Sequence, residues 1–255
     1  MPDLVIARYN EDINWVHNVP SEYNIIVYNK GERIKNISIL NRIQYIEIPN
    51  IGRESDSYLY HIINNMKKNH SFTIFTQGDP FEHAPDFLKL LSLPFENDVW
   101  GCSLRWKDNF PPEYILNKYK EKTGRLIRNE LFSLFNWAPV NWCDIGAYKS
   151  GCFYLSDYKV ENGTNIASDF FRRIGFYSMS LDASQAMFGE FSYGAIFGVK
   201  NNVVNKIDKE IFVNALREVR SYPVTGYIME RLWLHMFGQP FIGLRDNIFD
   251  NYFPI

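Results

Sequence analysis

The chain has 255 residues, a length that suits one large α/β domain. Apolar residues make up 46% of it and charged residues 22%, so a sizeable core is expected and extensive disorder is not. The formal charge of -2 argues against a nucleic-acid-binding surface, which normally carries a basic stripe.

The first hundred residues alternate between strand and helix patterns. Strands are predicted where short β-rich apolar runs end in turn residues, at 4–8, 23–28, 45–48 and 71–76. Helical stretches are predicted over 12–18 and, from apolar residues at helical spacing, over 55–68. Strands separated by helices and short loops indicate βαβ units, so we expect a largely parallel sheet.

The second half of the chain shows a less regular pattern. We expect a strand over 99–104, a charged helix over 115–134, loops and short strands over 137–155, and a strand-like run over 188–199. Two further helices are predicted over 206–220 and 226–237. Since there is no internal repeat or convincing linker, we interpret 1–255 as one α/β domain with a more irregular C-terminal half.

Cysteine usage and hydropathy indicate an intracellular protein. The three cysteines have no CxxC spacing, which fits reduced thiols better than a disulfide framework or a zinc site. The N-terminus enters a strand almost at once, so no signal peptide is expected. No apolar run approaches the roughly 18 to 20 residues that span a bilayer, so no transmembrane segment is expected.

The most informative stretch is the predicted strand that runs into Gln77-Gly78-Asp79-Pro80. Ligands of open α/β sheets bind beyond the carboxyl ends of the strands, where an aspartate can hold a divalent metal and through it a diphosphate. His83 could share that metal, because imidazole and carboxylate together suit ions such as Mn²⁺. The alternative is that Asp79 only caps the turn and that His83 is structural.

Two other polar clusters stand where strands end or helices start. Tyr9 and Asn10 follow the first strand and could stack on and hydrogen-bond a nucleotide base; the alternative is that Asn10 caps the next helix. Gly52-Arg53 precedes a helix and offers backbone amides and a guanidinium as a phosphate grip. Glu54 also has a simpler role there, which is to complement the helix dipole.

The last cluster is Glu230-Arg231 within an apolar helix. Glu230 could act as a general base that partial burial activates, and the alternative is a charge pair that supports packing. Several catalytic motifs are absent: GxGxxG after the first strand, GxxxxGK[ST], GxSxG and HExxH. Their absence argues against dinucleotide-binding Rossmann enzymes, P-loop NTPases, elbow-type hydrolases and HExxH metalloproteases.

These clusters, in this order, resemble a family of uncharacterised bacterial, fungal and viral proteins that look like GT-A type glycosyltransferases. The matching stretches span nearly the whole chain: 7–12 (Ala-Arg-Tyr-Asn-Glu-Asp), 27–31 (Val-Tyr-Asn-Lys-Gly), 50–55 (Asn-Ile-Gly-Arg-Glu-Ser), 58–62 (Tyr-Leu-Tyr-His-Ile), 75–81 (Phe-Thr-Gln-Gly-Asp-Pro-Phe), 193–197 (Tyr-Gly-Ala-Ile-Phe) and 226–233 (Gly-Tyr-Ile-Met-Glu-Arg-Leu-Trp). The resemblance implies a GT-A-like nucleotide-binding sheet flanked by helices, with a nucleotide-sugar-binding half at 1–105 and an acceptor-side half at 106–255.

The resemblance further implies the activity. The enzyme would transfer a hexosyl or pentosyl group from a nucleotide-diphosphate sugar donor to a glycan or glycolipid acceptor, as in polysaccharide biosynthesis, in the cytoplasm or at the membrane surface. The alternative is a non-catalytic carbohydrate-binding or scaffold protein that retains the fold.

The resemblance also assigns residues to the donor side. Tyr9, Asn10 and Lys30 would face the nucleotide, and Arg53 its phosphates. Asp79 would replace the metal-binding aspartate of the Asp-x-Asp motif, with Mn²⁺ or Mg²⁺ as the metal.

Gln77 stands at the first acidic position of that motif. A mechanism with little or no need for metal therefore stays open. On the acceptor side, Glu230 would be the base that deprotonates an acceptor hydroxyl, and Asp144 is its rival.

Overall fold

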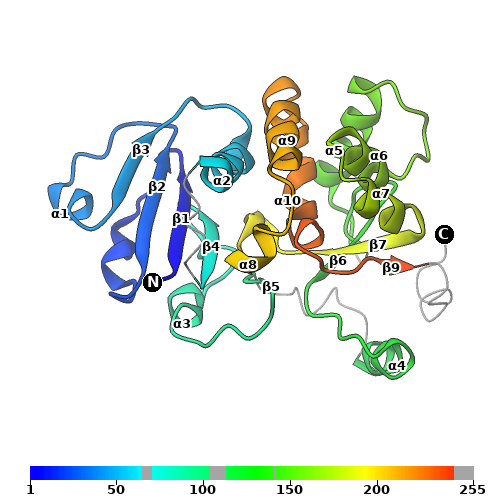
Figure 1. Cartoon of the computed structure of the whole chain (residues 1–255), viewed down its shortest axis with the longest axis horizontal. Coiled ribbons are helices and arrows are strands. Elements are labelled where there is room, and N and C mark those ends of the chain that lie inside the picture. Colours follow the sequence, from blue (N-terminus) through cyan, green and yellow to red (C-terminus); the bar gives the residue numbers. More distant parts are fainter. Residues whose placement is uncertain (65–70, 104–112, 141, 244–255) are drawn as a thin grey trace.

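The computed structural model describes residues 1–64, 71–103, 113–140 and 142–243. Its main sheet has six strands in the order β3-β2-β1-β4-β8-β5 (Figure 1). Four of these strands are mutually parallel: β1 (Asp3–Arg8), β2 (Asn24–Asn29), β3 (Gln44–Glu47) and β4 (Phe72–Gln77). The antiparallel strand β8 (Phe197–Lys200) separates β4 from β5 (Val99–Gly101). The carboxyl ends of β1, β2 and β4 therefore share one edge of the sheet.

Both faces of the sheet are buried, which explains the continuous apolar runs of its strands. Val5 and Ala7 of β1 face a core that they share with α2 (Arg53–Asn64), α9 (Lys209–Ser221) and α10 (Thr225–Met236). Leu4 and Ile6 face the opposite core, beneath the short helices η1 (Asn14–Asn18), α1 (Ile37–Leu40) and α3 (Phe87–Leu90). Alternate residues thus serve alternate layers, as in any pleated strand.

The second half adds a small antiparallel sheet, β6-β7-β9, formed by Glu130–Ser133, Ala186–Phe191 and Ile242–Gly243. Around it lie α4 (Glu113–Thr123), α5 (Ile145–Asp157), α6 (Ile166–Arg173) and α7 (Tyr177–Ser184) (Figure 1). Two short elements flank β8, namely η3 (Tyr193–Ala195) and α8 (Asn201–Val204). Helix α10 contacts α2, α5 and β7 and so joins the two sheets.

The predicted α/β class is confirmed: helices flank a mixed, mostly parallel sheet, and the C-terminal half is more irregular. The division at 105/106 into donor and acceptor halves stays a prediction. No helix in the described part of the chain is long and apolar enough to cross a bilayer.

Three predicted elements are wrong. The run over 188–199, predicted as strand-like, is divided by η3 into parts of β7 and β8, which belong to different sheets. The helix predicted over 115–134 ends at Thr123, because Gly124 takes a left-handed backbone with φ 72° and the chain then enters β6. The run over 137–155, predicted as loops and short strands, contains α5, whose first turn is capped by Asp144. Positions 65–68 of the predicted second helix and 104 of the predicted strand lie outside the described residues.

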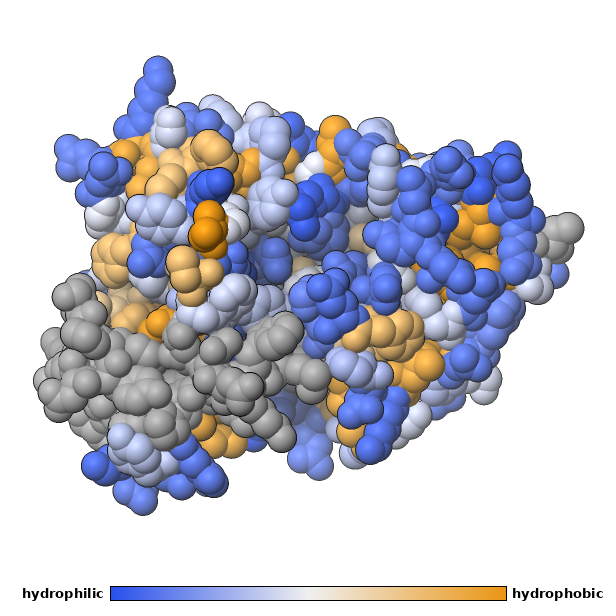
Figure 2. Space-filling view, turned by 180° about the vertical axis from the view of Figure 1, so that it is seen from behind, coloured by the Kyte–Doolittle hydropathy of each residue, from blue (hydrophilic) through white to orange (hydrophobic). Residues whose placement is uncertain are grey.

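The surface carries hydrophobic patches among hydrophilic residues, as Figure 2 shows for one face. Several large exposed apolar side chains belong to α5, among them Ile145, Tyr148 and Phe153, each more than half exposed. Isolated apolar residues on a surface need no explanation, but a group on one helix is notable.

An ion triad around the buried carboxylate of Asp56 joins the end of β2 to α2 and α9. Asp56 of α2 has no exposed surface, and its Oδ1 accepts a hydrogen bond from Arg220 Nε at 2.5 Å. Lys30 Nζ lies 3.5 Å from Asp56 Oδ2 and donates to the Ile51 carbonyl at 2.5 Å. The pKa of Lys30 is lowered by burial, against the opposing effect of Asp56. The triad therefore fixes where α2 begins relative to the sheet.

Asp56→Asn should destabilise the protein by ~3 kcal/mol, because two cations would lose their buried counter-charge. Urea denaturation at neutral pH measures the difference in the free energy of unfolding. Asp157→Asn is the matched control, since Asp157 is an exposed helical aspartate, and it should change stability by less than about 0.5 kcal/mol. Equal stability of Asp56→Asn and wild type would show that the triad contributes nothing.

Candidate functional site

The loops after β1 and β2 are fastened together at the carboxyl edge of the sheet. Arg8 Nη1 donates to the Glu32 carbonyl at 2.7 Å, and Asn10 Oδ1 accepts from Glu32 N at 2.8 Å. A side chain at Gly31 would place its Cβ 1.9 Å from the Tyr9 carbonyl oxygen, so only glycine fits there. The ring of Tyr9 remains half exposed at this edge.

The loop after β4 packs on the loop after β1. Trp15 Nε1 donates to the Gly78 carbonyl at 2.9 Å, and a Cβ on Gly78 would lie 2.7 Å from Glu11 Oε2. Asp79 is exposed, and its Oδ1 accepts the Phe81 N–H at 3.1 Å in a local turn. The turn-capping role considered from the sequence is therefore present, and it leaves the carboxylate facing solvent.

Gly194 of η3 connects this loop to α10. Its φ of 65° is left-handed, and a Cβ there would lie 2.9 Å from both Gln77 Nε2 and His83 Cδ2. Its N–H donates to Glu230 Oε1 at 3.2 Å. The neighbouring Tyr193 ring stacks on His83 with centroids 5.6 Å apart. Residues that the sequence placed in separate clusters are thus adjacent.

The two candidate bases line one cavity of about 190 Å³. Asp144 Oδ1 accepts the Ala147 N–H at 3.0 Å, and its Oδ2 lies 3.2 Å from Arg231 Nη2. Both oxygens of Asp144 are thereby engaged. Glu230 and Tyr227, one helical turn apart, are the residues of α10 that are not buried. Glu230 is therefore the α10 carboxylate presented to the cavity.

The start of α2 closes the site from another side. Gly52 and Arg53 have φ values of 63° and 53°, a conformation that costs a non-glycine residue on the order of 1 kcal/mol. The Arg53 guanidinium lies 4.0 Å from the ring centroid of Tyr227 and Arg53 Nε lies 3.4 Å from Glu54 Oε2. These contacts hold Arg53 in its strained backbone conformation beside α10.

Glu54 is the residue whose importance the sequence did not reveal. Its Oε1 is buried and has no hydrogen-bond partner within the described part of the chain. The pKa of Glu54 is raised to about 7, mainly by burial; the charge of Glu230 adds to this shift, and Arg53 and Lys30 oppose it. Groups with such perturbed pKa values gather at functional sites. The sequence showed only a glutamate at a helix start, because Glu230, whose charge acts on it, lies far away along the chain.

Of the predicted site residues, the structure brings Gln77, His83 and Glu230 together around Gly194, and Asp144 and Glu230 around one cavity. It places Tyr9 and Asn10 directly after β1, at the carboxyl edge of the parallel strands. Lys30 is nearly buried in the ion triad, so its contact with a nucleotide stays a prediction. Among the described residues, no group of three or more His, Cys, Asp or Glu side chains could hold a metal.

No protein-family model and no curated protein matches the chain. Among solved structures, the chain is similar to core-mannan synthase A from Aspergillus fumigatus in its Mn/GDP form. The sequences are 9% identical over 96% of this chain and 71% of that one, with a TM-score of 0.33. A similarity this low supports no statement about activity.

The pKa of Glu54 predicts a pH-dependent stability. Below about pH 4.5 both folded and unfolded states hold the proton, and between about pH 4.5 and 7 only the unfolded state releases it. Wild type should therefore lose stability as pH rises through this window, by on the order of 3 kcal/mol, and no more above it. Glu54→Gln lacks this loss, so it should be more stable than wild type at pH 8 and equal to it near pH 4.

Urea denaturation of both proteins across this pH range measures the difference. Glu161→Gln, which removes an exposed glutamate, should run parallel to wild type. A Glu54→Gln curve that does the same would show that the Glu54 pKa is ordinary.

Proposed function

We propose that the protein is a glycosyltransferase that moves a hexosyl or pentosyl group from a nucleotide-diphosphate donor to a glycan or glycolipid acceptor. The observation that carries the proposal is the continuity of the site. The cavity that contains Glu230 and Asp144 meets the loop after β4 through Tyr193 and Gly194. A donor at the strand ends and an acceptor in the cavity would therefore have their reacting groups side by side.

The donor occupies the carboxyl edge of β1, β2 and β4, where open α/β sheets bind ligands. The exposed ring of Tyr9 offers a stacking surface for a base, while Asn10 uses its amide oxygen to hold the loop after β2. Arg53 is the cation for the phosphates, because its guanidinium is partly exposed and planar. Gln77 lies between the donor loop and Gly194 and positions both.

A divalent metal, Mn²⁺ or Mg²⁺, would fit this site if the bound donor and water supplied most of its ligands. Asp79 and His83 supply two protein ligands at most, so phosphate oxygens and water would complete the coordination, as is common for Mg²⁺ with nucleotides. The exposed Asp79 carboxylate suits that role, since it is open to an incoming diphosphate. When bound, the metal would neutralise the charge that develops on the departing diphosphate.

The acceptor occupies the cavity of about 190 Å³, which offers aromatic rings, carboxylates and a serine to a sugar ring. Glu230 is the base, because one of its oxygens is held by Gly194 N and the other is available to an acceptor hydroxyl. Asp144 orients Arg231 and caps α5. The exposed Ile145 and Tyr148 next to the cavity suit the apolar part of a glycolipid. A cytoplasmic location, at the membrane surface for such an acceptor, belongs to this proposal.

One observation favours the non-catalytic alternative, a carbohydrate-binding or scaffold protein. Gln77 occupies the position of a metal-binding carboxylate. Such a protein would bind a glycan in the cavity but would bind no nucleotide sugar.

Nucleotide sugars should raise the melting temperature of the wild-type protein, more with Mn²⁺ than without, because ligands that bind the native state stabilise it. Asp79→Ala should abolish the Mn²⁺-dependent part of the shift and should abolish transfer. Asp86→Ala is the control, since it removes an exposed carboxylate from the same loop. The absence of any shift across a panel of nucleotide sugars would favour the scaffold protein.

Glu230→Gln should lower kcat by about 100-fold or more and leave the donor affinity within a few-fold, because glutamine keeps the bond from Gly194 N but cannot accept a proton. Asp144→Asn should cost far less, since asparagine still caps α5. Steady-state transfer kinetics separate the two. If Asp144→Asn lowered kcat more than Glu230→Gln, Asp144 would be the base.

A further inference from the structure

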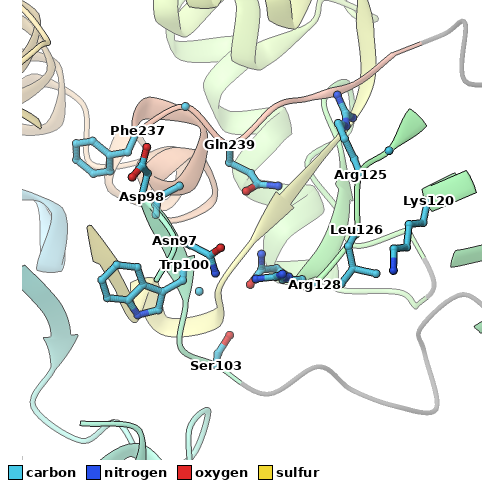
Figure 3. A pocket seen from close by; sticks show the side chains of 15 residues that line it. Asn97, Asp98, Trp100, Ser103, Lys120, Arg125, Leu126, Arg128, Phe237 and Gln239 are labelled. Atoms are coloured by element: carbon cyan, nitrogen blue, oxygen red, sulfur yellow. The ribbon is translucent and has the colours of Figure 1, made fainter. Parts of the chain in front are cut away.

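A second and larger cavity, of about 660 Å³, shares no residue with the cavity of Glu230. It opens between β5 and the segment 124–129 that follows α4, and Gln239 lies near its upper side in Figure 3. The basic side chains of Lys120, Arg125 and Arg128 lie on one side, opposite Asp98 from the segment before β5 (Figure 3).

The charges of this cavity are unbalanced. Of the described residues that line it, Lys120, Arg125 and Arg128 are cations and Asp98 is the one carboxylate. Asp98 already lies 3.2 Å from Lys200 Nζ. Among the described residues, none of the three lining cations forms an ion pair. The chain as a whole has a formal charge of -2, so this local excess of positive charge is not a general property of its surface.

Arg125 is held in place by neutral partners. Its Nη2 donates to the Phe241 carbonyl at 2.9 Å and to the hydroxyl of Tyr119, whose ring centroid lies 5.5 Å from the guanidinium carbon. Neither partner carries a charge. The guanidinium is therefore fixed in position without being neutralised, which is the state that a site for an anion requires.

The backbone of the same segment is fixed by the buried carboxylate of Glu190. Glu190 Oε2 accepts from Arg128 N at 3.0 Å and from Asn129 N at 3.1 Å, and Oε1 accepts from Gln239 Nε2 at 2.6 Å. Only the main chain of Arg128 takes part in these bonds, and its side chain is exposed. The carboxylate of Glu190 thus holds the backbone of the segment and the side chain of Gln239 that line the cavity.

We propose that this cavity binds a small ligand with at least two negative charges, of the class of diphosphates and phosphorylated sugars. Among the described lining residues, three cations stand against one carboxylate, and a single guanidinium can bind two phosphate oxygens in a fork geometry. The site lies outside the proposed donor and acceptor regions, so the proposal goes beyond the transfer reaction and does not depend on it.

Isothermal titration with inorganic pyrophosphate tests the proposal on the full chain. The titration is run in an Arg53→Gln background, which removes the guanidinium assigned to the donor phosphates, so that heat from that region does not contribute. Adding Lys120→Gln and Arg128→Gln should weaken the remaining binding at least about tenfold. The pair Lys89→Gln and Lys209→Gln removes two exposed charges elsewhere and should leave the affinity unchanged.

Three results would overturn the proposal. The first is that the Arg53→Gln protein does not bind pyrophosphate at millimolar concentration. The second is that the Lys120 and Arg128 substitutions leave its affinity unchanged. The third is that the control pair lowers the affinity as much as those substitutions do. Thermal unfolding of each variant verifies that the substitutions leave the protein folded. Failure of the donor proposal would change none of these readings, because the Arg53 side chain is absent throughout.

Discussion

The burial of α10 is the constraint on which the rest of the structure depends. Ten of its residues are buried against the parallel sheet, the small antiparallel sheet and α2, and Tyr227 and Glu230 are the exceptions. Burying an apolar helix on almost every side removes its freedom to rotate or slide, because cores are packed at near-crystalline density. The carboxylate of Glu230 is therefore positioned by the hydrophobic effect, and its own hydrogen bonds only refine that position.

Acidic and basic side chains lie next to one another around α10. Glu230 lies among Arg53, Glu54 and Gly194, while Arg231, the next residue, is directed to the carbonyl of Trp137 and to Asp144. Glu230 and Arg231 thus each have a hydrogen-bond partner, whereas Glu54 Oε1 has none among the described residues. An unsatisfied buried carboxylate costs free energy, and such costs are tolerated mainly where they serve a function.

The sequence was sufficient for the parallel half of the fold because the information there is local. Strand runs and Gly or Pro turns follow one another at short range, so β1 to β4 and the edge where they end were predictable. The predictions for the second half were wrong where contacts between distant parts of the chain determine the secondary structure. Glycine at 124 ends a helix that composition alone would extend, and Asp144 starts a helix within an aromatic-rich run. For the site, the sequence showed which polar residues follow the strands. It did not show that the charge of Glu230 acts on Glu54, because the two residues are far apart in the sequence.

The left-handed Gly194 limits how far the sequence can change at this site. Its Cα has no space toward Gln77 and His83 on one side, and its N–H is tied to Glu230 on the other. One peptide unit thus links the loop after β4 to the side chain of Glu230. A larger residue at position 194 would have to displace Gln77 or His83, so the sequence can change less at this position than at the exposed residues around it.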